Sequence, residues 1–356
     1  MKAVEIGNPI LAPDDLILVT GAAGFIGRRV VHALLSRGYT NLRCLVRFSS
    51  RTGELEHVLA DYGSSNVEIM RGNLLSAQDC TAAVRDAKVV YHVAAGRGEK
   101  SFPDAFMNTV VTTRNLLDAV VANGSLRRFV NISSFAVYTN DHKPYRNLLD
   151  ESCPVENHPE RRGNAYCFAK AEQDKLVEEY FRRFGLPCVT LRPGYVCGAG
   201  NPGIHSRVGI GTFGVFLHLG GSNPLPLTYV DNCADAIALA GLTPGVDGEV
   251  FNVVDDHLPS SRTFLRLYKR NVRRFRSIYV PHTLSYLLCR CWEAYSRWSQ
   301  GQLPPVYNRS AWRASWKKTR YSNSKLKNRL GWRPAVPVKE ALRLHFEACR
   351  RESAHA

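Results

Sequence analysis

Short apolar runs rich in β-branched residues alternate with amphipathic stretches of helix length through the first half of the chain. The apolar runs, which are typical of strands buried on both faces, lie at residues 16–20, 42–46, 67–70, 89–93, 129–132 and 188–191. The helical patterns between them lie at 26–36, 80–85, 110–122 and 169–184. Because strand and helix alternate at this spacing, the sequence predicts an α/β fold with a doubly wound parallel sheet and helices on both faces.

The pattern loosens after about residue 193 into segments rich in glycine and proline. Two short strand-like pieces, 227–230 and 250–253, are expected to return to the sheet. The sequence therefore predicts a sheet domain over 1–192, with returning segments at about 225–255. Residues 193–224 and 256–356 are expected to form a smaller, mostly helical C-terminal lobe.

The 356-residue chain has a formal net charge of +16, which is concentrated in its C-terminal quarter. Residues 260–356 hold 22 Lys and Arg against 4 Asp and Glu, whereas residues 1–259 hold 25 against 27. A basic lobe attracts an anionic substrate, an anionic membrane or nucleic acid, and it also serves as a solubilising surface. Neither a zinc finger nor an RNA-binding aromatic signature accompanies it, so a nucleic-acid partner is not expected.

The ten cysteines are scattered without paired CxxC spacing, so the sequence predicts neither a disulfide framework nor a metal site. The first residues lack the basic start, apolar stretch and cleavage site of a signal peptide. The uncharged run 277–289 is shorter than the roughly 20 residues that a membrane-spanning helix needs. We therefore expect a cytoplasmic protein with reduced thiols.

A glycine-rich turn follows the first predicted strand and opens the first predicted helix. A first glycine at such a place permits a tight turn, and a second lets the backbone approach a pyrophosphate, whose charge the helix N-terminus favours. In this context the turn predicts a dinucleotide site. The residues assigned to it are Gly21, Ala23, Gly24, Phe25, Ile26 and Gly27.

The end of the second predicted strand lacks the carboxylate that binds the free ribose hydroxyl of NAD. Arg47, Ser50 and Arg51 lie there instead, and arginine suits bidentate contacts with phosphate. We therefore predict NADP as the preferred cofactor, with NAD as the alternative.

Tyr166 and Lys170 are four residues apart on a predicted helix, so that their side chains share one face. An ammonium close to a phenol favours the phenolate, which suits a general acid/base for alcohol–ketone interconversion. The same lysine can donate hydrogen bonds to the ribose next to nicotinamide. Ser133 and Ser134 end the strand 129–132, and Ser134 can hold a substrate oxygen and steady the tyrosine.

These motifs resemble those of the extended short-chain dehydrogenases/reductases, the superfamily of NAD-dependent epimerases and dehydratases, whose sheet is of the Rossmann type. The likeness continues through 91–95, 108–117, 191–194, 228–232 and 250–252, and so covers most of the chain. It implies a catalytic triad of Ser134, Tyr166 and Lys170, with a hydride passing to or from nicotinamide. The further cofactor-binding residues that it implies are Asn73, Leu74, Ala94, Ala95, Asn108, Ser133, Arg192, Pro193 and Gly194. Asn73 replaces the family's acidic residue near adenine.

The branch of the family is indicated by what surrounds the triad. Ser133-Ser134-Phe135 lacks the Asp-Glu pair of sugar-nucleotide dehydratases, which disfavours dehydration, and 222–229 lacks the arginine that often holds a sugar diphosphate. The pattern resembles the 3β-hydroxysteroid and sterol dehydrogenases, which implies oxidation or reduction of an alcohol on a cyclic small molecule. The alternatives are a nucleotide-sugar 4-epimerase or 4-keto reductase and, in a different class, a non-catalytic NADP-binding redox sensor.

Residues 281–298 form a predicted helix with one apolar stripe, preceded by seven basic residues within 262–276. The stripe consists of Leu284, Leu287, Leu288, Cys291, Trp292, Tyr295 and Trp298. Two interpretations remain open: the stripe packs over the substrate pocket or another helix, or the segment 262–298 lies on an anionic membrane, at the inner membrane surface. The family resemblance also implies a homodimer that pairs through helices 110–122 and 167–184.

Overall fold

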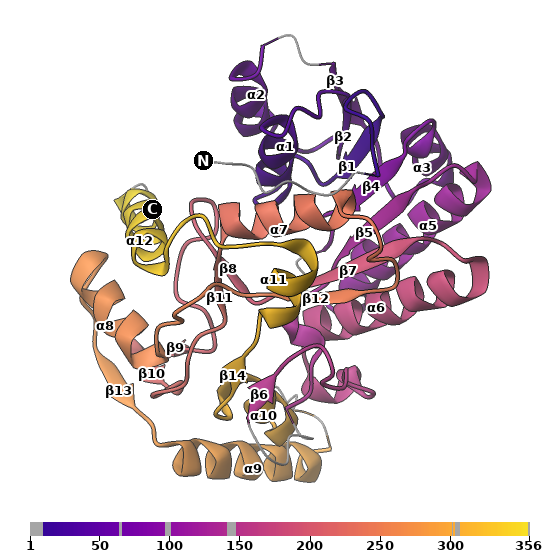
Figure 1. Cartoon of the computed structure of the whole chain (residues 1–356). Helices are drawn as coiled ribbons and strands as arrows, with labels where there is room; N and C mark the ends of the chain where they lie inside the picture. Colours follow the sequence, from indigo (N-terminus) through magenta and orange to yellow (C-terminus); the bar gives the residue numbers. More distant parts are fainter. Residues whose placement is uncertain are drawn as a thin grey trace.

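A seven-stranded parallel sheet forms the centre of the protein in a computed structural model that describes residues 10–63, 66–96, 101–140, 147–300, 302 and 307–354 (Figure 1). The strand order is β12-β7-β5-β4-β1-β2-β3. The strands are β1 (Ile17–Thr20), β2 (Leu42–Val46), β3 (Val67–Arg71), β4 (Val89–His92), β5 (Arg128–Ile132), β7 (Cys188–Pro193) and β12 (Val250–Val253). This order is that of a doubly wound Rossmann sheet, so the predicted fold class is confirmed.

One predicted strand lies elsewhere. Residues 250–253 form the edge strand β12, as expected, but β11 (Leu227–Tyr229) pairs with β8 (Tyr195–Cys197) in a separate two-stranded sheet. The prediction that 227–230 returns to the main sheet is therefore wrong. Because β7 is already paired with β5 on one side and β12 on the other, it offers β11 no free edge.

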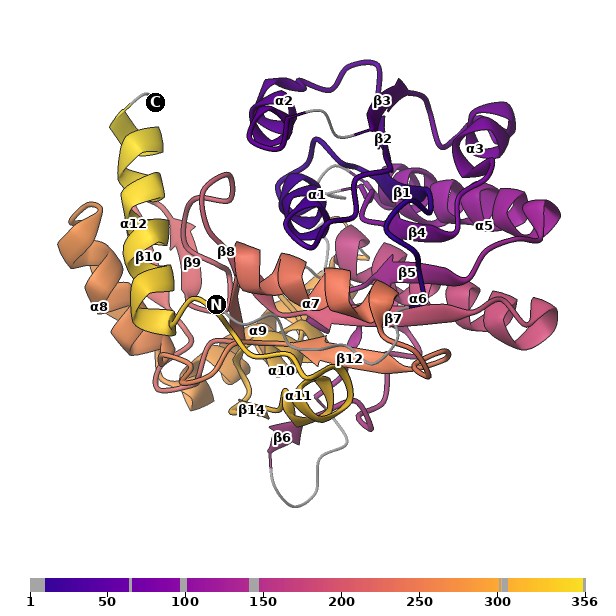
Figure 2. The same cartoon turned by 45° about the horizontal axis from the view of Figure 1, so that its top comes forward.

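Two layers of helices cover the sheet, as Figure 2 shows. One face carries α1 (Gly27–Leu35) and α7 (Val230–Leu242), with α2 (Gly53–Ala60) beside α1. The other face carries α3 (Ala77–Val84), α5 (Thr112–Asn123) and α6 (Ala165–Phe184). The predicted helix 110–122 begins earlier than expected, since α4 (Phe102–Ala105) and a π-helical turn over Phe106–Val111 lead directly into α5. Such π turns are frequent at functional sites.

The C-terminal lobe combines helices with small sheets. Its helices are α8 (Ser261–Asn271), α9 (His282–Trp298), α10 (Arg309–Trp316), α11 (Ser324–Leu330) and α12 (Val338–Ala354). Its strands are β9 (Gly209–Thr212), β10 (Val215–His218), β13 (Ser277–Tyr279) and β14 (Arg320–Tyr321), and β14 pairs with β6 (Leu148–Leu149). In the part of the chain that the structure describes, no helix is long and apolar enough to cross a membrane.

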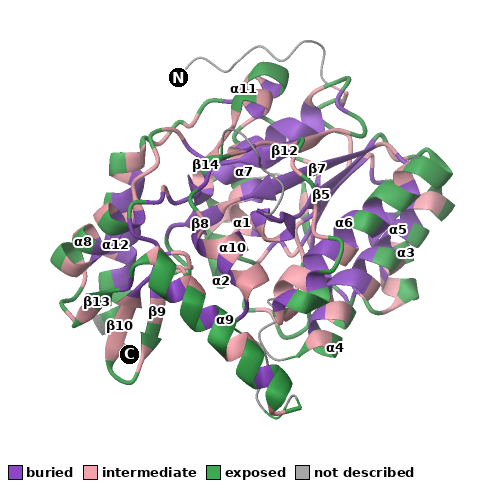
Figure 3. Ribbon diagram, turned by 90° about the horizontal axis from the view of Figure 1, so that it is seen from below, coloured by how far each residue is buried: buried purple, intermediate pink, exposed green. Residues whose placement is uncertain are grey.

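Most of the apolar stripe of α9 is exposed to solvent, in keeping with the mostly green and pink ribbon of this helix in Figure 3, and Trp292 of the stripe is half-buried against Tyr307. The side chains of Leu284, Leu287, Leu288, Tyr295 and Trp298 are between 47% and 78% exposed. The buried positions of the helix are Ser285, Cys289 and Ser296, and the Trp312 indole of α10 donates a hydrogen bond to the Ser285 hydroxyl (2.9 Å). The helix therefore packs through the face that carries Ser285, Tyr286 and Cys289, contrary to the interpretation that its stripe packs over the substrate pocket or another helix.

Candidate active site

The carboxyl ends of the central strands open into one cleft of about 960 Å³. Parallel α/β sheets bind their ligands at this edge, where the order of the strands reverses. Each residue that the sequence predicts for catalysis or cofactor binding lines the cleft, with the exception of Arg192. Sequence positions up to 173 residues apart, from Gly21 to Gly194, are thus brought to one site.

The glycine turn has the geometry that a pyrophosphate site needs. Gly21 has a φ of +68°, and a Cβ built on Gly27 would lie 2.1 Å from the carbonyl oxygen of Gly21. These two glycines hold the turn tightly against α1. A Cβ on Gly24 would meet only that same oxygen, at 3.0 Å, so this position is otherwise open. No side chain caps the N-terminus of α1, which leaves its positive end for an anion.

The electrostatics of the cleft fit a dinucleotide. Among its described lining residues are Arg47, Arg51 and Lys170, but neither Asp nor Glu. The two arginines lie just beyond β2, where a chain turn joins the Ser50 amide to the Arg47 carbonyl (2.9 Å). Near the expected adenine position, the Asn73 side-chain oxygen accepts a hydrogen bond from the Leu75 amide (3.0 Å), so it braces the loop after β3.

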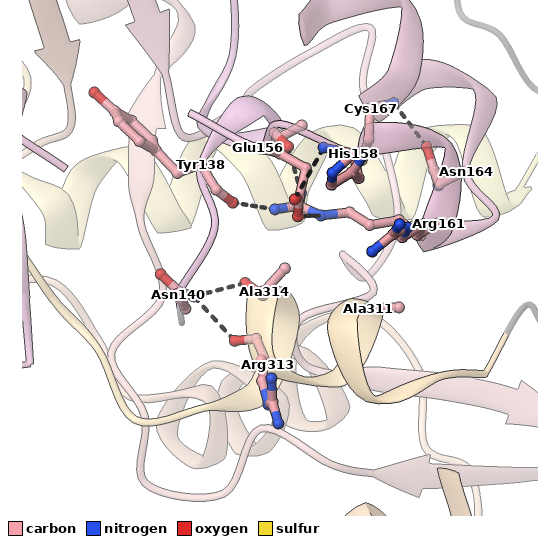
Figure 4. A network of polar contacts seen from close by, with 12 residues as sticks. Tyr138, Asn140, Glu156, His158, Arg161, Asn164, Cys167, Ala311, Arg313 and Ala314 are labelled. Atoms are coloured by element: carbon pink, nitrogen blue, oxygen red, sulfur yellow. Dashed lines mark hydrogen bonds and ion pairs between the residues drawn. The ribbon is translucent and has the colours of Figure 1, made fainter. Parts of the chain in front are cut away.

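Tyr166 lies in the first turn of α6, which begins at Ala165 because the Asn164 side chain caps it by accepting a hydrogen bond from the Cys167 amide (2.9 Å; Figure 4). Lys170 follows one turn later and is 4% exposed. Its ammonium donates to the carbonyl oxygen of Ile132 (2.7 Å) and to Oε1 of Gln173 (2.8 Å). Burial lowers the pKa of Lys170 to about 8, against the opposing effect of the Asp174 carboxylate.

The two serines after β5 differ in their surroundings. The Ser134 hydroxyl oxygen accepts a hydrogen bond from the Ala136 amide (3.1 Å), which keeps its proton available to a substrate oxygen. The Ser133 hydroxyl is 3% exposed and has no hydrogen-bond partner among the described residues. Because a buried hydroxyl rarely stays unsatisfied, Ser133 fits the prediction that a ligand contacts it.

Arg162 joins the segment of Ser134 to the start of α6. It is 3% exposed, pairs with Glu156 (3.1 Å) and donates to the carbonyl oxygens of Ala136 (2.6 Å) and Tyr138. Two residues on, the Asn140 carboxamide donates to the carbonyl oxygens of Arg313 and Ala314 (3.0 Å each), which attaches this segment to α10 (Figure 4). The C-terminal lobe is thereby attached beside the residues that the sequence predicts to be catalytic.

Arg192 does not line the cleft. Its guanidinium pairs with Asp174 (3.0 Å) and lies over the Tyr138 ring (4.8 Å to the centroid), and the residue is 7% exposed. In the described residues it therefore has a structural partner in place of the expected cofactor. The neighbouring Pro193 and Gly194 do line the cleft.

The sequence did not single out the wall that the C-terminal lobe contributes or the polar residues behind Lys170. The wall includes Tyr195, Val196, Asn201, Pro202, Ile204 and His205. Burial, aided by the charge of Arg207, lowers the pKa of His205 to about 3, so this imidazole is neutral. Behind Lys170, Gln173 lies one helical turn further along the same face of α6, and that i, i+3 spacing is the signal that could have identified it.

Comparison with known proteins agrees with this geometry. The model of the NAD dependent epimerase/dehydratase family matches residues 17–253. A trifunctional UDP-glucose 4,6-dehydratase/UDP-4-keto-6-deoxy-D-glucose 3,5-epimerase/UDP-4-keto-L-rhamnose-reductase of Arabidopsis thaliana is 29% identical over 67% of this chain. The match spans only 36% of that relative's length, about a third. A 3beta-hydroxysteroid-dehydrogenase/decarboxylase of Arabidopsis thaliana is 25% identical over 92% of this chain and 77% of its own.

Solved structures confirm the fold. The crystal structure of gox2253 has a TM-score of 0.74 and 24% identity, with 95% of this chain and 98% of that chain covered. The UDP-glucuronic acid 4-epimerase of Bacillus cereus, in complex with UDP-glucuronic acid and NAD, has a TM-score of 0.70 and 20% identity over 95% of this chain and 99% of its own. The family match, the Rossmann sheet and the composition of the cleft lead to one conclusion: this chain belongs to the NAD dependent epimerase/dehydratase family.

Proposed function

We propose that this enzyme interconverts a secondary alcohol and a ketone on an apolar cyclic substrate, in the manner of a 3β-hydroxysteroid dehydrogenase. The observation that carries the proposal is the lining of the cleft, which combines Ser134, Tyr166 and Lys170 with a wall from the C-terminal lobe that is apolar apart from Asn201, His205 and the Tyr195 hydroxyl. Among the described lining residues of 193–205, there is neither lysine nor arginine to hold a sugar diphosphate. An apolar wall gains free energy from an apolar substrate at about 25 cal/mol per Å² of buried surface.

The glycine turn and Lys170 would hold a dinucleotide whose nicotinamide would supply the hydride for reduction or accept it for oxidation. In the reductive direction, the Tyr166 phenol gives its proton to the carbonyl oxygen as the carbonyl carbon gains the hydride. Ser134 donates a hydrogen bond to the same oxygen and stabilises its developing charge. Lys170 then stabilises the phenolate, and oxidation follows the same steps in reverse.

A second candidate is a nucleotide-sugar 4-epimerase or 4-keto reductase. The activities of the Arabidopsis trifunctional relative support it, and so does the excess of basic residues in the C-terminal lobe. A non-catalytic NADP-binding redox sensor is less well supported, because such a protein needs no catalytic triad, whereas Ser134, Tyr166 and Lys170 are all present in the cleft.

One experiment separates these candidates. The purified protein is analysed for co-purified ligands by mass spectrometry and then assayed with a panel of hydroxysteroids, ketosteroids and nucleotide sugars through the absorbance of reduced cofactor. Epimerisation, which has no net redox change, is followed by chromatography of the sugars. Turnover of ring alcohols or ketones alone supports the first proposal, turnover of nucleotide sugars supports the second, and cofactor binding without turnover supports the sensor.

We further propose NADP as the preferred cofactor. Arg47 and Arg51 at the end of β2 support this preference, since no carboxylate among the described lining residues would repel a 2′-phosphate. Fluorescence titrations with NADPH and NADH side by side test it. Tighter binding of NADPH is expected, and a clear preference for NADH would overturn the proposal.

We also propose that α9 lies on an anionic bilayer. The exposed stripe of α9 supplies apolar side chains, and the exposed arginines of 262–276 supply positive charge, each worth about 1 kcal/mol near an anionic surface. The exposed arginines are Arg262, Arg266, Arg270, Arg273, Arg274 and Arg276. This combination fits an anionic lipid surface better than an apolar face of a second copy of this basic chain.

Vesicle flotation tests the membrane proposal. Binding to phosphatidylglycerol vesicles at low salt, with little binding to phosphatidylcholine vesicles, is expected. The double variant L287E/W298E should lose binding, whereas F184E, which changes an exposed phenylalanine at the end of α6, should retain it. Absence of flotation at low salt, or burial of the α9 stripe in a dimer detected by light scattering, would refute the proposal.

A homodimer through α5 and α6 remains a proposal that rests on the family alone. The outward face of α6 carries the charged side chains Lys175, Glu178, Glu179, Arg182 and Arg183, so a dimer there would need complementary ion pairs. The mass measured by light scattering across a salt series tests it, and a monomer at every salt concentration would exclude it.

A further inference from the structure

A chain of buried polar side chains lies behind Lys170, on the side away from the cleft. Its members are Gln173 of α6, Thr113 of α5, His92 of β4 and Thr20 of β1, and each is 0% exposed. The proposed reaction uses none of them. Four polar side chains without access to water require mutual hydrogen bonds, because an unsatisfied buried polar group costs about 1–3 kcal/mol.

The hydrogen bonds form an unbroken series. Gln173 accepts from the Lys170 ammonium through Oε1 (2.8 Å) and donates through Nε2 to the Thr113 hydroxyl oxygen (2.9 Å). The same hydroxyl lies 2.9 Å from Nε2 of His92, whose Nδ1 lies 2.9 Å from the Thr20 hydroxyl. Thr20 in turn accepts from the amide of Ala94, a residue of the cleft wall (3.3 Å).

The direction of each hydrogen bond follows from the donors available. An ammonium can only donate, so Gln173 must turn its oxygen to Lys170 and its NH₂ group to Thr113. The Thr113 hydroxyl donates its proton to the carbonyl oxygen of Thr109 (2.6 Å). Its oxygen can therefore only accept hydrogen bonds from Gln173 and His92. Thr20 donates to Nδ1 of His92, its one acceptor among the described residues, so His92 carries its proton on Nε2 and donates it to Thr113.

The chain therefore has one self-consistent arrangement. Burial, with the charge of Lys170, lowers the pKa of His92 to about 3, which keeps the imidazole neutral. Of the charged groups, the Asp174 carboxylate on the same helix acts on Lys170 and is itself paired with Arg192, and the proposed function adds the Tyr166 phenol once it is ionised. Gln173 contributes a strong acceptor without adding a negative charge.

We propose that Gln173 is a positioning residue that, held by Thr113 and His92, fixes the Lys170 ammonium so that its remaining N–H is available to Tyr166 and the cofactor ribose. Ile132 and Gln173 accept two of the three ammonium hydrogens, which leaves one, and Lys170 itself lines the cleft. This inference rests on the role of Lys170 in the proposed function. A neutral amide also suits the site better than a carboxylate, which would draw the ammonium away from the phenol.

The experiment needs no substrate. Two properties of each variant are measured: the pH at which Tyr166 ionises, from the near-UV absorbance difference against the same variant carrying Y166F, and the affinity for NADPH, from fluorescence. The variants are Q173M, which keeps the length of the side chain without its polar atoms, and T113V, which removes the hydroxyl that holds Gln173. T113S retains that hydroxyl, and T228V is the control for loss of a buried hydroxyl elsewhere, since Thr228 is 0% exposed and bonded to Asp255 (3.0 Å).

The expected results follow from the loss of one hydrogen bond to an ammonium. Q173M should raise the pH of Tyr166 ionisation by about one unit and weaken NADPH binding by about tenfold. T113V should shift the pH of Tyr166 ionisation and the NADPH affinity in the same direction, but by less. The double variant Q173M/T113V should resemble Q173M alone, because the two residues act through one chain of hydrogen bonds. T113S should behave as the wild type, and T228V should lower only the melting temperature.

The proposal is overturned if folded Q173M and T113V lose thermal stability while both properties stay at the wild-type values, since Gln173 would then be only a part of the core. It is also overturned if T228V shifts both properties as much as T113V does. The enzyme could also show the expected shifts in Tyr166 ionisation and NADPH affinity but turn over no tested alcohol or ketone. That result would support the positioning role of Gln173 and would count only against the proposed reaction.

Discussion

The three glycines of the turn after β1 should respond differently to a single added methyl group. Gly27→Ala places its Cβ 2.1 Å from the carbonyl oxygen of Gly21, although ordinary contacts begin at 3.4 Å, so α1 must move away by more than an ångström. Overpacking of this kind costs about 1–3 kcal/mol. Gly21→Ala should lose about 1–2 kcal/mol of stability because its φ is +68°, and its added Cβ would also lie 2.9 Å from the backbone of Ala94.

Gly24→Ala meets only the Gly21 oxygen, at 3.0 Å, and needs no positive φ, so a loss of stability below about 1 kcal/mol is expected. Its methyl group lies where the backbone must approach the pyrophosphate. Loss of one hydrogen bond to a charged phosphate, about 1.5–3 kcal/mol, weakens NADPH binding roughly 10- to 100-fold.

Thermal unfolding and fluorescence titration of NADPH, applied to all three variants, test this reasoning. At about 2–4 °C per kcal/mol, a cost of about 1–3 kcal/mol in Gly21→Ala and Gly27→Ala should lower the melting temperature by roughly 2–12 °C, and Gly24→Ala should lower it by less than about 4 °C. The decisive result is that Gly24→Ala weakens NADPH binding strongly while it changes the melting temperature little. The reasoning fails if that variant binds NADPH within about twofold of the wild type, or if it melts as early as Gly27→Ala.

Further predictions follow from the same site. Tyr166→Phe should abolish turnover while NADPH affinity stays within a few-fold of the wild type, and retained turnover would remove the tyrosine from its assigned role. Arg47→Glu should weaken NADPH binding at least about tenfold and NADH binding much less, measured by paired titrations; an equal loss for both would mean that Arg47 does not contact the 2′-phosphate. The pKa of Lys170 is about 8 in the folded state and 10.5 for a lysine side chain in water, so the unfolded chain holds one more proton between these values, and stability should rise with pH across this window by about 3 kcal/mol. Lys170→Met should flatten this part of the profile of unfolding free energy against pH, and an unchanged slope would contradict the lowered pKa.

Local pattern was sufficient for much of the site. Strand runs, helix periodicity and the glycine turn each extend over a few residues, so the sequence alone placed the Rossmann sheet, the turn at Gly21 and the shared face of Tyr166 and Lys170. Residues at the carboxyl ends of parallel strands meet at one edge by topology, which explains why Ser134 lies in the cleft, whereas Ala94 was assigned to the cofactor by the family resemblance.

Only the tertiary structure determined which side chains, strands and helix faces contact one another, because a periodic pattern shows which face of an element is apolar but not what packs against that face. Arg192 pairs with Asp174 and does not line the cleft. Strand β11 pairs with β8, since β7 has no free edge. The chain behind Lys170 joins residues from Thr20 to Gln173, a separation that no local spacing encodes. The stripe of α9 is exposed because the helix packs on α10 through its other face, where Ser285 accepts a hydrogen bond from the Trp312 indole and Tyr286 packs on the Trp312 ring, and no local pattern encodes that packing.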